Sequence, residues 1–223
     1  EPVRPTRRFW SSTLDVALGD MAGLVAPEHL VLCEGRPPKG ATDNKAAFDA
    51  ACYQTIFVSE FPNTDFVSVG NSDDVSNDRL EFGLTFQTLV TSTRLTRLVD
   101  RDTRSELEVQ ELHAAGIRVL SRRHLEAYLL DDEVMSLLCT ALGQPDKVPE
   151  ALTIKQEELA ASVERGNDPD DHKSAAGTVY VRLRKSLGIT GGGSTWHAFA
   201  RDTLAPLIKP GTAVYGVVRE DVF

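Results

Sequence analysis

Four short apolar segments alternate with helix-like stretches along the first two thirds of the chain, and this alternation constrains the fold most. The apolar segments are 29–35, 65–70, 94–102 and 117–121. The first is an apolar run that closes on an acid and a glycine, which is typical of a buried parallel strand. Because strands that alternate with helices pair in parallel through right-handed crossovers, we expect an α/β fold with a parallel sheet of about four strands flanked by helices.

The intervening segments divide into predicted helices and polar loops. Gly116 stands directly after the predicted helix 104–115, in the position that favours a left-handed glycine. From residue 147 onward the pattern is mostly helical, with a polar break at 165–172 and a glycine-rich turn at 190–193. The predicted helices are 46–61, 80–92, 104–115 and 124–143, and the predicted loops are 36–45 and 71–79.

The chain is expected to divide into three parts. Residues 1–27 are a lead-in with one short helix, and residues 28–143 are the α/β domain that carries the motifs described below. Residues 144–223 are a mostly helical subdomain that completes the same site. A chain of 223 residues with 41% hydrophobic residues can bury one sizeable core, or one core and a small lobe.

Charge and cysteine content narrow the classes of protein. A formal net charge of −9 does not favour nucleic-acid binding, but the acids of a metal-dependent nuclease are offset by bound cations. Cys33, Cys52 and Cys139 are too few and too scattered for a disulfide framework, so we expect buried thiols in a reducing compartment. No apolar run reaches the length of about 20 residues that spans a bilayer, and no signal peptide is evident, so we expect a cytoplasmic protein without a membrane partner.

Acidic residues follow two of the predicted strands. Glu34 and Gly35 close the first, and Asp100, Arg101 and Asp102 close the third. The carboxyl ends of parallel strands form one edge of a sheet, so these acids should meet there. Asp100 and Asp102 should point to the same side if the segment is extended. Since gathered carboxylates repel each other, the pattern predicts a site for divalent cations with oxygen ligands.

These motifs resemble the two signatures of the Toprim domain, the fold shared by topoisomerases, DnaG-type primases, RecR-type recombination proteins and OLD-family nucleases. The segments LVDRDTRS, AGIRVLSRRHLEAYLLDDEV, DDHKSAAGTVYVRLRKSLG and FARDTLAPLIKPGT resemble the C-terminal nuclease region of OLD-family ATPase–nucleases most closely. The resemblance covers most of the chain from about residue 28 onward.

The resemblance implies two divalent ions, Mg²⁺ or Mn²⁺, with Ca²⁺ able to substitute without activity. A further metal-binding acid should follow Glu34, and Asp49 and Asp43 both qualify, with Asp49 the better match. Lys173 corresponds to a lysine near the scissile phosphate and would act with Glu34 and Asp100 in catalysis. The implied metal ligands are Glu34, Asp49, Asp100, Asp102 and Glu126.

Charged residues around these motifs allow two interpretations. The arginines either contact DNA phosphates or form ordinary surface ion pairs. The acids at 131–134 and at 168–171 are interpreted as solvated charge. His172 and His197 do not pair with acids or cysteines at metal-ligand spacing in the sequence, so each is interpreted as an ordinary histidine. The arginines predicted to bind nucleic acid are Arg101, Arg104, Arg122 and Arg123.

The sequence therefore predicts a metal-dependent DNA endonuclease, the nuclease portion of an OLD-like protein. The glycine-rich turn 188–196 lacks the Lys-Ser/Thr ending of a phosphate-binding loop, so this chain should not hydrolyse ATP by itself. The resemblance to OLD-family proteins implies an ABC-type ATPase domain upstream, with homo-oligomerisation through that region. One alternative is a catalytically idle Toprim module that serves as a DNA-binding, regulatory or interaction domain. An unrelated α/β phosphatase or phosphotransferase that uses Asp-x-Asp is a third interpretation.

Overall fold

A computed structural model describes residues 27–35, 47–76 and 93–223. Three predicted segments lie outside these residues: the lead-in helix before Pro27, the loop 36–45 with Asp43, and the helix 80–92. Within the described residues no helix is long and apolar enough to cross a membrane.

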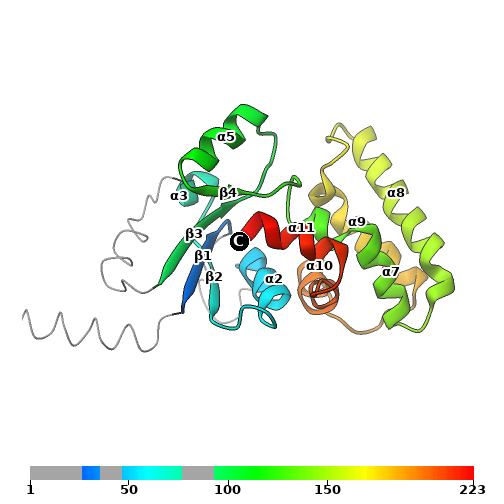
Figure 1. Ribbon diagram of the computed structural model, residues 1–223. Helices are drawn as coiled ribbons and strands as arrows, with labels where there is room; N and C mark the ends of the chain where they lie inside the picture. The colour runs from blue at the N-terminus through cyan, green and yellow to red at the C-terminus, as the bar shows by residue number, and fades with distance from the viewer. Residues whose placement is uncertain (1–26, 36–46, 77–92) are drawn as a thin grey trace, which may run out of the picture.

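The described residues form a parallel sheet of four strands in the order β2-β1-β3-β4, which confirms the predicted fold class (Figure 1). The strands are β1 (His29–Cys33), β2 (Thr64–Ser68), β3 (Arg94–Val99) and β4 (Ile117–Val119). Every residue of β1 is buried, as its apolar run predicted.

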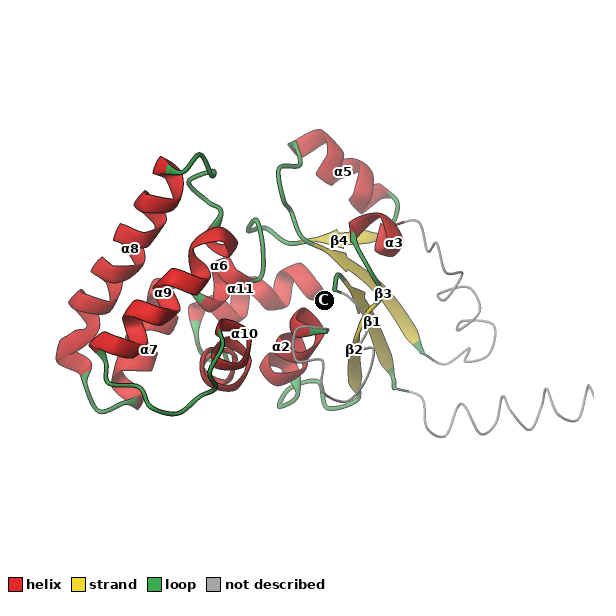
Figure 2. Ribbon diagram, turned by 180° about the vertical axis from the view of Figure 1, so that it is seen from behind, coloured by secondary structure: helices red, strands yellow, loops and turns green. Residues whose placement is uncertain are grey.

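Helices cover both faces of this sheet (Figure 2). On one face α2 (Phe48–Phe57) and α11 (Ala213–Val222) pack in the main apolar core. On the other face α3 (Ser72–Ser76) and α5 (Glu106–Ala114) enclose a smaller cluster of valines and Ile117. A doubly covered parallel sheet is a Rossmann-like arrangement.

Two local predictions were wrong. The segment 71–79 was expected to be a loop, but α3 forms because Asn71 and Asp74 each accept a hydrogen bond from the other's backbone N–H. The segment 124–143 was expected to be one helix, but it divides into α6 (Glu126–Leu129) and α7 (Asp132–Ala141). Asp131 separates them, because its backbone is not helical and its carboxylate caps the N-terminus of α7.

The remaining helices form a bundle beside the sheet (Figure 1). The last helix, α11, returns to the sheet, where Phe223 stacks on Phe61 with ring centroids 4.0 Å apart. One continuous apolar core therefore runs from the sheet into the bundle. The other helices and short helical turns are η1 (Pro145–Lys147), α8 (Val148–Glu164), α9 (His172–Ser186), α10 (Trp196–Phe199), η2 (Ala200–Leu204) and η3 (Ala205–Leu207).

The strand order places a topological switch point between β1 and β3. The chain passes from β1 to β2 on one side, and β3 then pairs with β1 on the other side. Beyond the carboxyl ends of such strands the crossovers diverge and leave room for a ligand. Glu34 and Asp100 are the first residues after β1 and β3, so both lie at this point.

Candidate metal centre

The turn after β1 depends on Gly35. Gly35 and Gly70 exchange two backbone hydrogen bonds of 2.8 and 2.9 Å, which tie the ends of β1 and β2 together. Gly35 has a φ of 125°, and a Cβ atom there would lie 2.6 Å from Ser68 Oγ. Only glycine fits this conformation and this approach. The turn leaves Glu34 partly buried, with its Oε1 accepting a hydrogen bond from the Asp100 backbone N–H at 3.0 Å.

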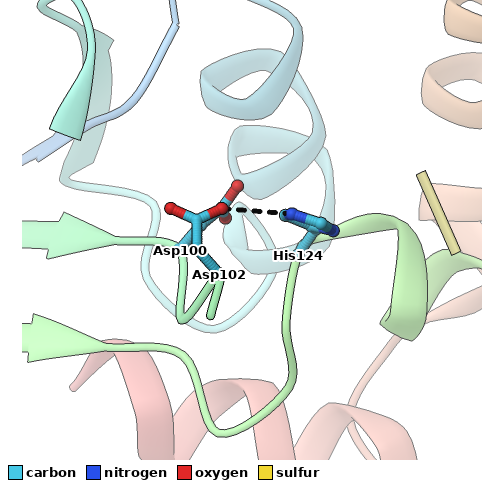
Figure 3. Close-up of side chains that lie close together, drawn as sticks. All are labelled: Asp100, Asp102 and His124. Atoms are coloured by element: carbon cyan, nitrogen blue, oxygen red, sulfur yellow. Dashed lines mark hydrogen bonds and ion pairs between the residues drawn. The ribbon is translucent and has the colours of Figure 1, made fainter. Parts of the chain in front are cut away.

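The Asp100–Asp102 segment is not extended, contrary to our expectation. Strand β3 ends at Val99, and Asp102 takes a left-handed conformation with a φ of 48°. Aspartate tolerates this conformation better than most residues. The Asp102 N–H donates to the Arg123 carbonyl, so the turn is held against the segment that follows β4. The two carboxylates nevertheless lie close together, through a turn and not through strand alternation (Figure 3).

Asp49 and Glu126 reach the same region from two helices. Asp49 lies in the first turn of α2, and Glu126 is the first residue of α6. Glu126 is 4% exposed, and its Oε2 has no hydrogen-bond partner. A buried carboxylate oxygen without a partner is costly, and a bound cation or a proton would satisfy it.

Burial and mutual repulsion favour the protonated forms of the acids. Burial, together with the negative charges of Asp49 and Glu34, raises the pKa of Asp100 well above its usual range. Burial and the charge of Glu126 raise the pKa of Asp49 to about 7. Burial also raises the pKa values of Glu34 and Glu126. Divalent cations would remove this repulsion, and the clustered oxygen donors fit Mg²⁺ or Mn²⁺.

Two cationic side chains offset part of this charge. Lys173 Nζ, from the first turn of α9, lies 3.8 Å from Asp100 Oδ2. Although partial burial lowers it, the charges of Glu126 and Asp100 raise the pKa of Lys173 above its ordinary value, so the ammonium stays charged. Arg104 donates to Asp102 Oδ2 at 3.0 Å and to the hydroxyl of Ser72.

His124 belongs to the site, although the sequence analysis did not consider it. Its Nε2 lies 3.1 Å from Asp102 Oδ1, and ligand atoms of Asp100, Asp102 and His124 all lie within 4.8 Å of one another (Figure 3). Burial and the charge of Lys173 lower the pKa of His124, so the ring is neutral near pH 7. One signal was available: His124 follows the fourth strand, which ends at the same edge of the sheet as the acids.

The predicted nucleic-acid-binding arginines already have acidic partners. Arg101 pairs with Glu106, and Arg122 pairs with Asp131 at 2.7 Å. Arg123 bridges Asp168 at 2.6 Å and Asp170 at 2.7 Å. The cavity beside the metal centre has a volume of about 630 Å³. The basic residues that line this arginine-lined cavity are Arg101, Arg122, Arg123, Lys155 and His172.

The interpretation of the acids at 131–134 and 168–171 as solvated charge was wrong for several of them. Asp131 caps α7, and Asp171 caps α9 by accepting from the Ser174 backbone at 3.0 Å. Both Glu133 oxygens accept backbone N–H groups from the first turn of α11. Helix starts need acceptors for such N–H groups. Asp131 and Asp171 supply them locally, whereas Glu133 does so through tertiary packing that the sequence does not reveal.

All three cysteines are free and buried, as predicted. Neither models of known protein families, nor curated proteins, nor solved structures gave a match to this chain.

Proposed function

We propose that this chain is a Mg²⁺- or Mn²⁺-dependent DNA endonuclease of the Toprim type, the nuclease portion of an OLD-like ATPase–nuclease. One observation carries the proposal. Carboxylates from four separate segments converge at the switch point of a parallel sheet, where burial raises several of their pKa values and few cations offset their charge. Such an arrangement is unfavourable unless cations bind, and enzymes use perturbed groups of this kind for chemistry.

The chain's own residues would share the work as follows. Glu34, Asp49, Asp100, Asp102 and Glu126 would hold two divalent ions, which when bound supply charge stabilisation and an activated water. Lys173 would neutralise negative charge on the scissile phosphate, since its ammonium faces the acids from α9. The arginines of the cavity would contact DNA phosphates on either side.

The wider setting is also part of the proposal. An ABC-type ATPase domain would precede this region in the full-length protein, and homo-oligomers would form through that domain. The protein would work in the cytoplasm, where reduced cysteines persist.

Cleavage of supercoiled plasmid tests the proposal. We expect nicking or linearisation by wild type with Mg²⁺ or Mn²⁺, none with Ca²⁺ alone, and loss of cleavage in Asp100→Ala. Glu111→Ala is the matched control, because Glu111 is an exposed acid on α5 and should not affect cleavage. Equal cleavage by wild type and Asp100→Ala would refute the assignment of the site.

Isothermal titration with Mn²⁺ separates the enzyme from an idle module. Metal binding without cleavage of either plasmid strand would indicate a site that needs its ATPase partner, and the full-length protein should then cut. Absence of both metal binding and cleavage would support the idle module, because its acids would have no use for cations.

A further inference from the structure

We infer that His124 is a direct ligand of one ion at this site, together with Asp100 and Asp102, and that this ion position prefers Mn²⁺ over Mg²⁺. The inference rests on the proposed metal centre and adds to it a nitrogen ligand and a metal preference.

The separations between the three side chains fit one ion. Ligand atoms of Asp100, Asp102 and His124 lie within 4.8 Å of one another, and His124 Nε2 is 3.1 Å from Asp102 Oδ1. Adjacent ligands around an octahedral ion with bonds of about 2.1 Å stand about 3 Å apart, so the two atoms already have that spacing.

The second ring nitrogen of His124 faces a carboxylate. Nδ1 has no hydrogen-bond partner and lies 3.8 Å from Asp171 Oδ1. Metal-binding histidines usually direct their other ring N–H toward a carboxylate, which fixes the ring and the tautomer. Asp171 is itself held in place, because the backbone N–H and the hydroxyl of Ser174 both donate to it.

Burial around His124 supports a ligand on this side of the cluster. His124 is 7% exposed, so solvent does not satisfy its ring. Glu126, two residues further on, is 4% exposed and has an oxygen without a hydrogen-bond partner. Together with burial, the negative charge of Glu126 raises the pKa values of both Asp49 and Asp100, so Glu126 lies near the cluster.

The ligand types decide the metal preference. Mg²⁺ strongly favours oxygen ligands, whereas imidazole suits transition metals, and Mn²⁺ accepts both nitrogen and carboxylate oxygen. The other predicted ligands, Glu34, Asp49 and Glu126, offer oxygen only. The position at His124 should therefore hold Mn²⁺ more tightly than Mg²⁺.

Electron spin-echo envelope modulation of bound Mn²⁺ tests the inference directly. We expect ¹⁴N modulation from imidazole in the wild type and none in His124→Gln, with Mn²⁺ affinity about 10- to 100-fold lower and Mg²⁺ affinity changed less. Asp171→Asn keeps the helix cap and should weaken Mn²⁺ binding while retaining the modulation. The control is His113→Gln, which removes an exposed histidine of α5.

The outcomes separate the two proposals. Mn²⁺ that binds the wild type without nitrogen modulation, or modulation that persists in folded His124→Gln, would overturn the role of His124 and leave the metal centre intact. Equal loss of Mn²⁺ and Mg²⁺ affinity in His124→Gln would overturn the metal preference. No Mn²⁺ binding by folded wild type would overturn the metal centre itself, and the inference with it.

Discussion

The candidate metal centre and the arginine-lined cavity lie side by side, but they differ in how far their charged side chains are paired with opposite charges. At the candidate metal centre, acids that follow β1 and β3 gather with acids of α2 and α6, and Lys173 and Arg104 neutralise part of their charge. In the cavity, Arg122 and Arg123 each bind carboxylates within 2.7 Å. The proposed metal centre would therefore gain from a cation taken from solution, whereas the arginines of the cavity are already paired with carboxylates.

This difference leads to separate expectations for metal binding and for DNA binding. Gathering buried acids lowers the stability of the folded protein, and bound cations would raise it again. Metal binding should therefore increase stability. The arginines lose little by staying paired, so a DNA phosphate must compete with Asp131, Asp168 and Asp170 for them. Metal binding should therefore be strong and DNA binding by this region weak and sensitive to salt.

The largest expected effect is the stability gained by Asp49→Asn in metal-free protein. The folded-state pKa of Asp49, about 7, exceeds its ordinary value of 3.8, so the folded protein holds this proton more tightly than the unfolded chain does. Stability is therefore lost as pH rises from about 4 to about 7. Asparagine cannot ionise, so the variant should gain stability that grows between pH 5 and pH 8, to at most about 4 kcal/mol. Chemical denaturation with a chelator present measures this gain.

Metal should reverse that order. With saturating Mn²⁺ at pH 8 the wild type should become more stable than Asp49→Asn, because the variant loses a ligand. Glu111→Gln, an exposed acid on α5, serves as the control and should follow the wild type throughout. A gain that is the same at pH 5 and pH 8 would contradict the electrostatic account.

The sequence predicted the sheet and the gathering of acids for one physical reason. Local apolar runs predict the strands, and parallel pairing then brings the residues after β1 and β3 to the same edge of the sheet. Glu34 and Asp100 could be placed from that argument alone. The turn at Asp102 could not, because its left-handed backbone depends on a hydrogen bond to Arg123, which belongs to another segment.

His124 and the break at Asp131 were missed for different reasons. The apolar spacing from 124 to 143 fits one helix, but Asp131 caps a new helix through a local hydrogen bond from the Glu133 backbone N–H, which the periodicity does not show. His124 carries chemistry because Asp102 and Asp171 lie on either side of it, although they are 22 and 47 residues away. Pairings of this kind come from the fold and are not visible in local spacing.

The second prediction concerns DNA binding by a variant in which Arg123 of the cavity has lost its acidic partners. The double variant Asp168→Asn/Asp170→Asn removes both partners of Arg123 and should bind duplex DNA about 3- to 10-fold more tightly at about 50 mM salt. The gain should disappear at high salt, because screening weakens phosphate contacts. Fluorescence anisotropy of labelled DNA in Ca²⁺ measures it without cleavage.

A matched pair of acids elsewhere controls for net charge. Arg182 bridges Glu157 and Glu158 in the bundle, so Glu157→Gln/Glu158→Gln removes the same charge away from the cavity. If both double variants tighten DNA binding equally, the effect comes from overall charge and the cavity has no special role.

The smallest predicted effect is a loss of stability in Glu133→Gln. Like Asp49→Asn, this substitution replaces an acid by its amide, but the stability should change in the opposite direction. Glu133 accepts the Ala213 and Val214 N–H groups at 3.1 and 2.9 Å, which caps the start of α11. Glu133→Gln should lower stability by about 1 kcal/mol, because it loses one acceptor and the favourable charge at a helix N-terminus. Glu220→Gln, an exposed acid near the end of α11, is the control and should be neutral or slightly stabilising.

Thermal unfolding at pH 8 compares the three variants. If Glu133→Gln stabilised the protein as Asp49→Asn should, acid removal would act through net charge alone, and the contrast between an acid that caps a helix and an acid crowded by other acids would fail.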